Sequence, residues 1–165
     1  GEQYDLKSVT ACVTNLYGPY DTFNLVRTKV VGALIRKFVE ARLEGGDSVE
    51  CWGTGDPMRE FMYVDDAGEA IVQALEKYED NSLPLNIGTG KDISIKQLVE
   101  HIVEAVGYEG EVDWNTDKPD GQMKKLLDVS RMKSMIDISP MSVKDGIEKT
   151  VNWYSSNKEK ADAKS

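Results

Sequence analysis

The sequence predicts an α/β fold, because short β-rich segments alternate with amphipathic helical segments along the 165 residues. Residues 95–106 give the clearest helix signal, since apolar side chains recur there at i, i+3, i+4, i+7, i+8 and i+11. Residues 8–14 give the clearest strand signal, and they lead directly into a turn at Gly18-Pro19.

The first half of the chain is predicted to hold three strands and two helices. The strands are expected at 8–14, 49–52 and 60–64, and the helices at 29–43 and 65–78. Gly45 should stop the first helix, and Asp65-Asp66 should cap the start of the second. On that second helix, Ile71, Val72 and Leu75 are expected to face the core.

The second half is predicted to continue the alternation. Strands are expected at 83–87, 112–114 and 126–129. Ser94 opens a capping box for the 95–106 helix, and Gly107 ends that helix. A last helix begins near Ser142, and the polar tail at 155–165 is expected to fray.

Charge and cysteine content limit the classes of protein. The net charge of −9 repels a phosphate backbone, so no nucleic-acid partner is expected. No apolar run approaches the ~20 residues that cross a bilayer, so no membrane partner is expected either. Cys12 and Cys51 are interpreted as buried thiols of a reducing compartment, which favours a cytoplasmic location; a disulfide is the alternative.

Several catalytic motifs are incomplete. The single histidine, His101, lies on the polar side of a predicted helix, so no metal site is expected. The Gly88-Thr89-Gly90-Lys91 stretch lacks the following Ser or Thr of a phosphate loop, and a strand-to-helix turn explains its glycines better. Tyr4 and Lys7 are three residues apart rather than the four of a helical Tyr-Lys pair.

Arg59 and Trp52 offer a binding chemistry. The planar guanidinium of Arg59 suits a diphosphate, and Trp52 offers a flat apolar face for a base or a sugar. On the residues alone, a structural role remains open, in which Trp52 belongs to the core and the cations to the surface.

Five phrases in order resemble the C-terminal half of the GDP-L-fucose synthases, nucleotide-sugar epimerase/reductases of the extended short-chain dehydrogenase/reductase family. They are TNLYGP at 14–19, LIRKF at 34–38, WGTGDPMREFMYVDD at 52–66, LNIGTGKDISIKQL at 85–98 and KPDGQMKKLLDVSR at 118–131. The resemblance implies a single fragment over 1–165, made of the C-terminal strands of a Rossmann-type sheet plus the small α/β substrate-binding domain. The N-terminal cofactor domain, with the main NADP or NAD contacts and the Tyr-x-x-x-Lys pair, would lie upstream.

Site residues follow from the resemblance position by position. Val13, Thr14, Asn15 and Leu16 match the stretch beside the nicotinamide end of the cofactor. The positions matching contacts to the nucleotide-diphosphate sugar are Lys37, Trp52, Arg59, Lys118 and Asp120. The resemblance also implies a homodimeric parent that pairs through helices outside this chain.

Lys29 departs from the family pattern. It stands where the family has a histidine that acts as general acid beside the cofactor. An unperturbed lysine has a pKa near ~10.4, so it is mostly a charged donor at neutral pH. Gly32 likewise replaces a common proline. We therefore expect the epimerisation step to be altered or lost, while the 4-keto reduction could survive.

Two functions remain in view. The first is the sugar-nucleotide-binding part of an NAD(P)-dependent epimerase/reductase acting on a 4-keto-6-deoxyhexose, with the fragment alone inactive. The alternative is a stand-alone module that binds a sugar nucleotide without catalysis.

Overall fold

The computed structural model describes residues 8–25, 27–78 and 83–163. Its elements are β1 (Ala11–Val13), β2 (Asn15–Tyr17), α1 (Val30–Glu44), β3 (Ser48–Trp52), β4 (Met58–Tyr63), α2 (Val64–Lys77), β5 (Leu85–Ile87), β6 (Asp92–Ser94), α3 (Ile95–Val106), β7 (Glu111–Asn115), β8 (Lys124–Lys125), α4 (Ser130–Lys133) and α5 (Val143–Asp162). None of the helices within the described ranges is long and apolar enough to cross a membrane. Tyr4 and Lys7, whose spacing does not fit a helical Tyr-Lys pair, lie outside these ranges.

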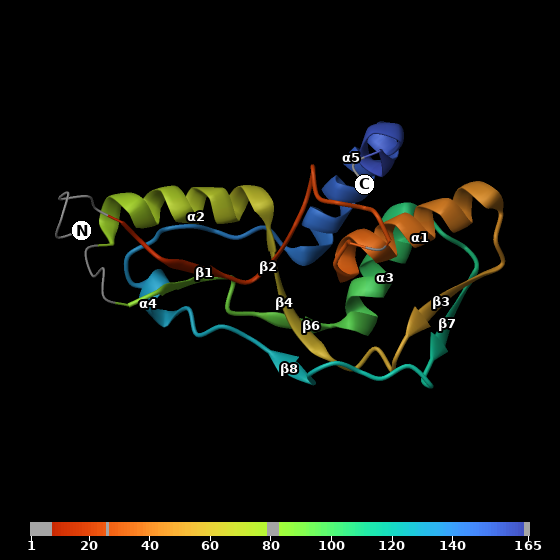
Figure 1. Cartoon of the computed structure of the whole chain (residues 1–165), viewed down its shortest axis with the longest axis horizontal. Helices are drawn as coiled ribbons and strands as arrows, with labels where there is room; N and C mark the ends of the chain where they lie inside the picture. Colours follow the sequence, from red (N-terminus) through yellow and green to blue (C-terminus); the bar gives the residue numbers. More distant parts are fainter. Residues whose placement is uncertain (1–7, 26, 79–82, 164–165) are drawn as a thin grey trace.

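The elements gather at two ends of the molecule, and β4 runs between them (Figure 1). One end holds α2, α4, β1 and β5, and the other holds α1, α3, α5 and the β3–β7 pair. Each end has its own core. Phe61 belongs to the core beneath α1, α3 and α5, whereas its neighbour Met62 belongs to the core beneath α2. Successive side chains of a strand point to opposite faces, so β4 serves both cores.

The predicted strand at 8–14 divides in the structure, because the chain changes partner at Thr14. β1 runs parallel to β5, with Ala11 opposite Leu85, and the Thr14 N–H extends this pairing to the Ile87 carbonyl at 3.0 Å. β2 runs parallel to β4 instead, with Asn15 opposite Phe61. Near its start β4 pairs with β6 antiparallel and with β8 parallel, and these two lie on opposite edges because both pair with Met58 and Arg59. β3 pairs with β7.

Helix ends agree with the sequence at Ser94, Gly45, Gly107 and Ser142, and the start of the second helix differs. Ser94 forms the predicted capping box, and Gly45 and Gly107 end their helices in the left-handed conformation. The second helix begins one residue earlier than predicted, with Tyr63 at the N-cap and no side-chain cap. Asp65 and Asp66 therefore lie in the first turn, where carboxylates interact favourably with the helix dipole.

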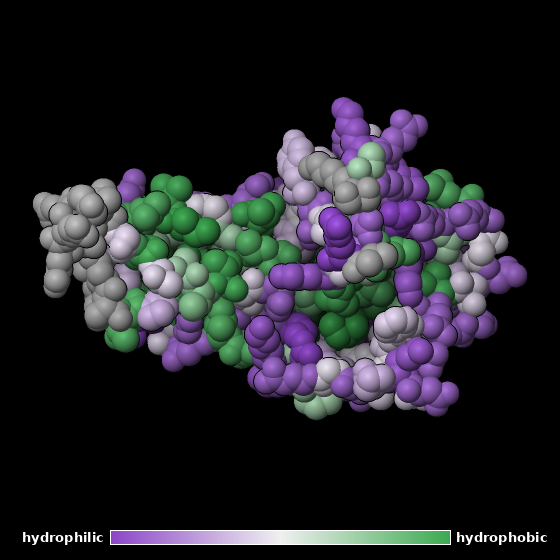
Figure 2. Space-filling model, in the orientation of Figure 1, coloured by the Kyte–Doolittle hydropathy of each residue, from purple (hydrophilic) through white to green (hydrophobic). Residues whose placement is uncertain are grey.

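The inward face of α2 was predicted correctly at Ile71, which packs against the core, and wrongly at Val72 and Leu75. Ala67, Ala70 and Ala74 are buried, whereas Val72 and Leu75 are 56% and 58% exposed. The small alanines allow the helix to pack closely on the strands, which turns the larger side chains outward. Figure 2 shows hydrophobic residues gathered on the visible face of this end of the molecule.

The two cysteines differ in environment. Cys51 is buried, and burial raises its thiol pKa to about 11, as expected for an inert core cysteine. Cys12 is exposed, so the expectation of two buried thiols is wrong for it. It lies on the short strand β1, where Ala11 and Val13 on the other face pack against the core.

Three short elements were misplaced or missed. The strand predicted at 126–129 is absent from the described structure, and β8 forms just before it at Lys124–Lys125. The Leu127 N–H donates to a Glu60 carboxylate oxygen at 3.1 Å, which replaces a strand hydrogen bond. β6 and α4 were not predicted, because segments of three and four residues are too short for periodicity to reveal.

Glu60 connects β4 to two other segments through a carboxylate with no exposed surface. Its Oε1 accepts hydrogen bonds from the Gly90 N–H at 2.7 Å and from the Thr89 hydroxyl at 3.3 Å. Its Oε2 accepts the Leu127 bond described above. A Cβ at Gly88 would collide with the same carboxylate, so glycine permits the close approach. A buried carboxylate is tolerated only when donors surround it in this way.

Replacing Glu60 with alanine is expected to destabilise the protein by about 3 kcal/mol, because backbone donors lose a charged acceptor. Urea unfolding of E60A beside wild type measures this. E76A, which removes an exposed carboxylate from α2, is the matched control. Equal stability of E60A and E76A would contradict the assigned role.

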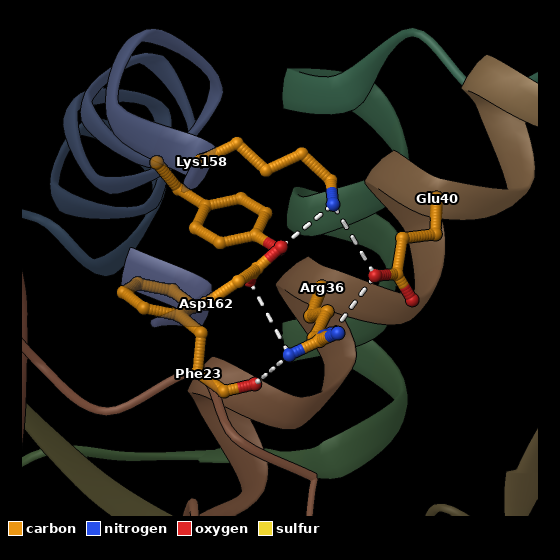
Figure 3. A network of polar contacts seen from close by, with 6 residues as sticks. Phe23, Arg36, Glu40, Lys158 and Asp162 are labelled. Carbon is orange, nitrogen blue, oxygen red and sulfur yellow. Dashed lines mark hydrogen bonds and ion pairs between the residues drawn. The ribbon is translucent and has the colours of Figure 1, made fainter. Parts of the chain in front are cut away.

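The C-terminal part of α5 is helical and packed, contrary to the expectation that residues from 155 fray. The helix runs to Asp162 with a kink at Asn157. Figure 3 shows how Lys158 and Asp162 of α5 meet Arg36 and Glu40 of α1. Lys158 Nζ lies 2.7 Å from Asp162 and 3.4 Å from Glu40, and Arg36 lies 2.9 Å from Glu40 and 3.3 Å from Asp162. Polar residues thus join two helices here, which hydrophobic periodicity cannot reveal.

This network also reaches the loop before α1. Arg36 donates to the Phe23 carbonyl at 3.3 Å, and the Phe23 ring stacks on Tyr154 with centroids 4.4 Å apart. Tyr154 in turn donates its hydroxyl to Asp162 at 2.9 Å. Asp162 therefore joins α5, α1 and this loop.

Replacing Asp162 with alanine is expected to cost about 1–2 kcal/mol at neutral pH. Burial acts to raise the pKa of Asp162, but the Lys158 and Tyr154 hydrogen bonds and the Arg36 charge outweigh it, so the pKa lies below its ordinary value. The contribution is therefore present above the ordinary carboxyl pKa and is lost as pH falls through the lowered one. Thermal unfolding of D162A, wild type and E159A across pH 2–7 tests this. A difference between D162A and wild type that stays constant at acid pH would contradict it.

Candidate nucleotide-sugar site

A cavity of about 250 Å³ brings together residues that the sequence singled out from distant positions. Asn15 comes from β2, Trp52 from the end of β3, Arg59 from β4 and Asp120 from the loop after β7. The floor includes apolar side chains from β4 and from the starts of α1 and α3, namely Phe61, Val30 and Ile95. In the orientation of Figure 1, Figure 2 shows a hollow near the middle of the molecule with hydrophobic residues at its floor and hydrophilic residues around it.

Trp52 is a surface residue, because its side chain is 64% exposed. Its indole N–H donates to Glu50 at 2.9 Å, which fixes the ring. Lys37 and Lys118 place their ammonium groups 5.7 and 5.3 Å from the ring centroid. Trp52, Lys37 and Lys118, all predicted to contact the substrate, therefore lie next to one another. An aromatic ring flanked by two cations suits a base or sugar ring that carries phosphates.

Glu50 orders this part of the site. Besides the Trp52 bond, it accepts a hydrogen bond from the Asn115 side chain at 2.9 Å. The Asn115 and Trp52 donors lower its pKa, and the Lys37 and Lys118 charges act in the same direction. The ionised carboxylate therefore persists at neutral pH as an acceptor for the indole.

Arg59 borders the cavity, and its guanidinium charge is not neutralised by a carboxylate of the described residues. The guanidinium donates to the Met58 carbonyl at 2.7 Å. A Cβ at Gly121 would lie 3.2 Å from its guanidinium, so the 119–121 loop closes against it. Most guanidinium donors thus stay available to an anion, which fits the bidentate contacts that arginine makes with phosphates.

Asp120 borders the cavity, but its carboxylate is already engaged. It accepts from the Thr54 N–H at 2.9 Å and from the Thr54 hydroxyl at 2.7 Å, and these bonds lower its pKa. Gly53 has a φ of 80°, and a Cβ there would collide with Asp120. The geometry therefore supports a role for Asp120 in fastening the 118–121 loop to the 53–55 turn.

The predicted cofactor stretch runs from β1 into β2 beside β4. Thr14 and Asn15 donate their side chains to the Glu60 carbonyl at 3.3 and 2.8 Å. Asn15 reaches the cavity, whereas Val13, Thr14 and Leu16 do not line it. Their contact with a nicotinamide cofactor stays a prediction.

Lys29 lies at the N-terminal end of α1 and does not line the cavity. It is the exposed N-cap residue of the helix, and its neighbour Val30 lines the cavity wall. Gly32 follows in the first turn, and a Cβ there would collide with the Thr28 hydroxyl and approach the Thr22 carbonyl to 2.8 Å. Glycine at 32 thus lets the preceding loop fold back on α1, close to Lys29.

Sequence reasoning missed Glu60, a buried residue that does not line the cavity but holds the strand carrying Arg59. It sits beside Arg59 and holds the Gly88-Thr89-Gly90 turn, which connects β5 to β6 instead of leading straight into a helix. A signal was present, because an acidic residue inside the apolar strand segment EFMYV requires internal donors.

Comparison with known proteins gives consistent likenesses. The chain is 40% identical over 155 residues to GDP-L-fucose synthase 1 of Arabidopsis thaliana. The matched region covers 94% of this chain and 48% of that protein. The structure of a GDP-L-fucose synthetase from Naegleria fowleri bound to NADP matches 93% of this chain and 48% of its own, with 27% identity and a TM-score of 0.89. A GDP-6-OMe-4-keto-L-xylo-heptose reductase from Campylobacter jejuni matches 94% of this chain and 56% of its own, with 30% identity and a TM-score of 0.83.

These likenesses confirm the predicted α/β fold of the extended short-chain dehydrogenase/reductase type. The chain spans about half the length of the relatives it matches. The model of the NAD dependent epimerase/dehydratase family matches residues 1–88, which is more than half of the 165 residues. The chain belongs to the NAD dependent epimerase/dehydratase family.

Proposed function

We propose that this chain forms the nucleotide-sugar-binding part of an NADP- or NAD-dependent epimerase/reductase that acts on a GDP-linked 4-keto-6-deoxyhexose. The observation that carries the proposal is that Arg59 and Trp52 border one cavity, while Lys37 and Lys118 lie beside the Trp52 ring. The names of the relatives support a GDP-sugar over other nucleotide sugars.

The division of labour follows from charge and shape. Arg59 holds the diphosphate through its free guanidinium donors, and Trp52 packs against a ring of the ligand. Lys37 on α1 and Lys118 in the loop after β7 offset the negative charge of the phosphates. The cavity of about 250 Å³ is smaller than typical ligand pockets of roughly 300–1,000 Å³, so it holds only part of a nucleotide sugar.

The residues present fit one edge of a nicotinamide cofactor. Asn15 borders the cavity, and Thr14 and Asn15 are held in place by the Glu60 carbonyl. When bound, the cofactor supplies the hydride for the carbonyl at C4 of the sugar. The chain's own contribution is to orient the sugar nucleotide beside that edge and to offer Lys29 as a proton donor at a neighbouring carbon.

The Arg59→Ala variant tests whether Arg59 binds the diphosphate. It is made in the full-length protein encoded by the complete gene. We expect GDP binding to weaken about tenfold or more, because charge-assisted hydrogen bonds are lost. Calorimetric titration with GDP measures this, and Lys160→Ala, which removes an exposed cation from α5, is the control. Unchanged GDP affinity in R59A would refute the assignment. GDP binding without NADPH oxidation in the presence of GDP-4-keto-6-deoxymannose would instead favour the non-catalytic binding module.

Lys29→Ala separates chemistry from binding in the same protein. We expect the rate of proton transfer at the sugar to fall about 10²-fold, as for loss of a general acid, with GDP affinity unchanged because Lys29 does not line the cavity. Deuterium incorporation from solvent into the sugar reports this step. Lys37→Ala, beside Trp52, should raise KM with little change in kcat. An unaltered kcat in K29A would exclude a chemical role for Lys29.

A further inference from the structure

A second cavity, of about 480 Å³, lies outside the candidate nucleotide-sugar site. It is bordered by α4, by the segment leading to α5, and by residues of the β5–β6 turn. Its floor is apolar: Met132 and Ile136 are buried, and Ile138 and Met141 are half-buried. The cavity is nearly twice as large as the one beside Trp52, and nothing in the proposed reaction uses it.

Basic side chains surround this apolar floor. The ammonium-bearing residues Lys91, Lys133 and Lys144 line the cavity, together with the imidazole of His101. Lys144 is paired with Glu104 at 2.6 Å, but Lys91 and Lys133 have no carboxylate partner in the described part of the chain. A pocket with an apolar body and a few convergent polar groups is the usual form of a small-molecule site.

We propose that this cavity binds a small soluble organic anion, whose carboxylate or phosphate head lies between Lys91 and Lys133 and whose apolar body lies on the floor formed by Met132, Ile136 and Ile138. The paired charge of Lys144 leaves the two free lysines as the head-group contacts. A bare inorganic ion leaves the apolar floor exposed to water and gains less from the site.

The cavity is connected to Arg59 through Glu60. Gly88 and Thr89 line the cavity, and the Thr89 hydroxyl and the Gly90 N–H donate to the Glu60 carboxylate. Lys133 reaches over Gly90, since a Cβ built there would lie 3.0 Å from its ammonium group. A ligand that draws Lys133 toward itself therefore acts on the turn that Glu60 holds. Arg59 precedes Glu60 on β4, so occupancy is expected to alter its position; this second step rests on the proposed function.

The binding step is tested with 8-anilinonaphthalene-1-sulfonate, a fluorescent anion with an apolar body. The double variant Lys91→Glu/Lys133→Glu should bind it at least about tenfold more weakly than wild type. The matched control is Lys77→Glu/Lys160→Glu, which makes the same change of charge on exposed helix positions. Because the exposed Val72 and Leu75 on α2 also offer apolar surface, Ile138→Ser provides a second variant, in which the probe should again bind more weakly. Equal affinity in the lysine double variant and its control overturns the proposal.

Competition identifies the chemistry of the ligand. Phenyl phosphate should displace the probe at lower concentration than inorganic phosphate, because only the former fills the apolar floor. Equal potency of the two overturns the assignment of an apolar body. Vesicles of anionic phospholipid should leave the probe bound, and displacement by vesicles would assign the surface to a lipid headgroup in place of a soluble anion.

Coupling between the second cavity and the nucleotide-sugar site is measured in the full-length protein encoded by the complete gene. The quantity is the change in GDP affinity when phenyl phosphate is added to saturation. We expect a change of about threefold or more in wild type, within the usual range of coupling energies, and none in the Lys91→Glu/Lys133→Glu variant. No change in wild type overturns the coupling. Failure of GDP to bind in the absence of phenyl phosphate marks a failure of the proposed function instead, and the probe measurements distinguish the two.

Discussion

The buried Glu60 carboxylate is the interaction on which the arrangement of the described chain depends. It ties β4 to the turn at 88–90 and to the segment at Leu127, so three stretches far apart in sequence meet at one side chain. Its backbone carbonyl also receives Thr14 and Asn15. Without this carboxylate the 88–90 turn and the segment at Leu127 would need other acceptors, and a buried N–H without one is costly.

β4 joins the two cores, because its side chains pack into both of them. Phe61 and Met62 face different cores, and Arg59 reaches the candidate site from the same strand. The ends of the molecule are secured differently. Hydrophobic contacts dominate around α2, whereas the join between α1 and α5 adds the ion pairs of Arg36, Glu40, Lys158 and Asp162 seen in Figure 3. Because Arg36 also binds the Phe23 carbonyl, these ion pairs support the loop that leads to Lys29.

Local signals were read correctly where the chemistry itself is local. The capping box at Ser94 and the left-handed glycines at 45 and 107 depend on a few neighbouring residues, and the sequence contains all of them. Errors arose where distant partners decide. Thr14 changes strand partner, Leu127 gives its N–H to Glu60, and residues 158–162 pack through charges that a hydrophobic pattern does not register. The members of the candidate site were predicted through family resemblance, and the structure adds that Trp52, Lys37 and Lys118 meet in space. Asp120 shows the limit of that approach, since its carboxylate already serves Thr54.

The alternation along β4 has a consequence for how this gene tolerates change. Arg59 borders the cavity while Glu60 is buried against the 88–90 turn, so cation and anion occupy adjacent, oppositely directed positions. Inserting or deleting one codon within this strand would exchange them, since a slip of one residue turns each side chain to the other face. The cavity would then present a carboxylate where an anionic ligand must approach, and an arginine would be forced among the donors that Glu60 satisfies. Reading-frame-preserving indels within this strand should therefore be nearly absent from any functional library of this protein.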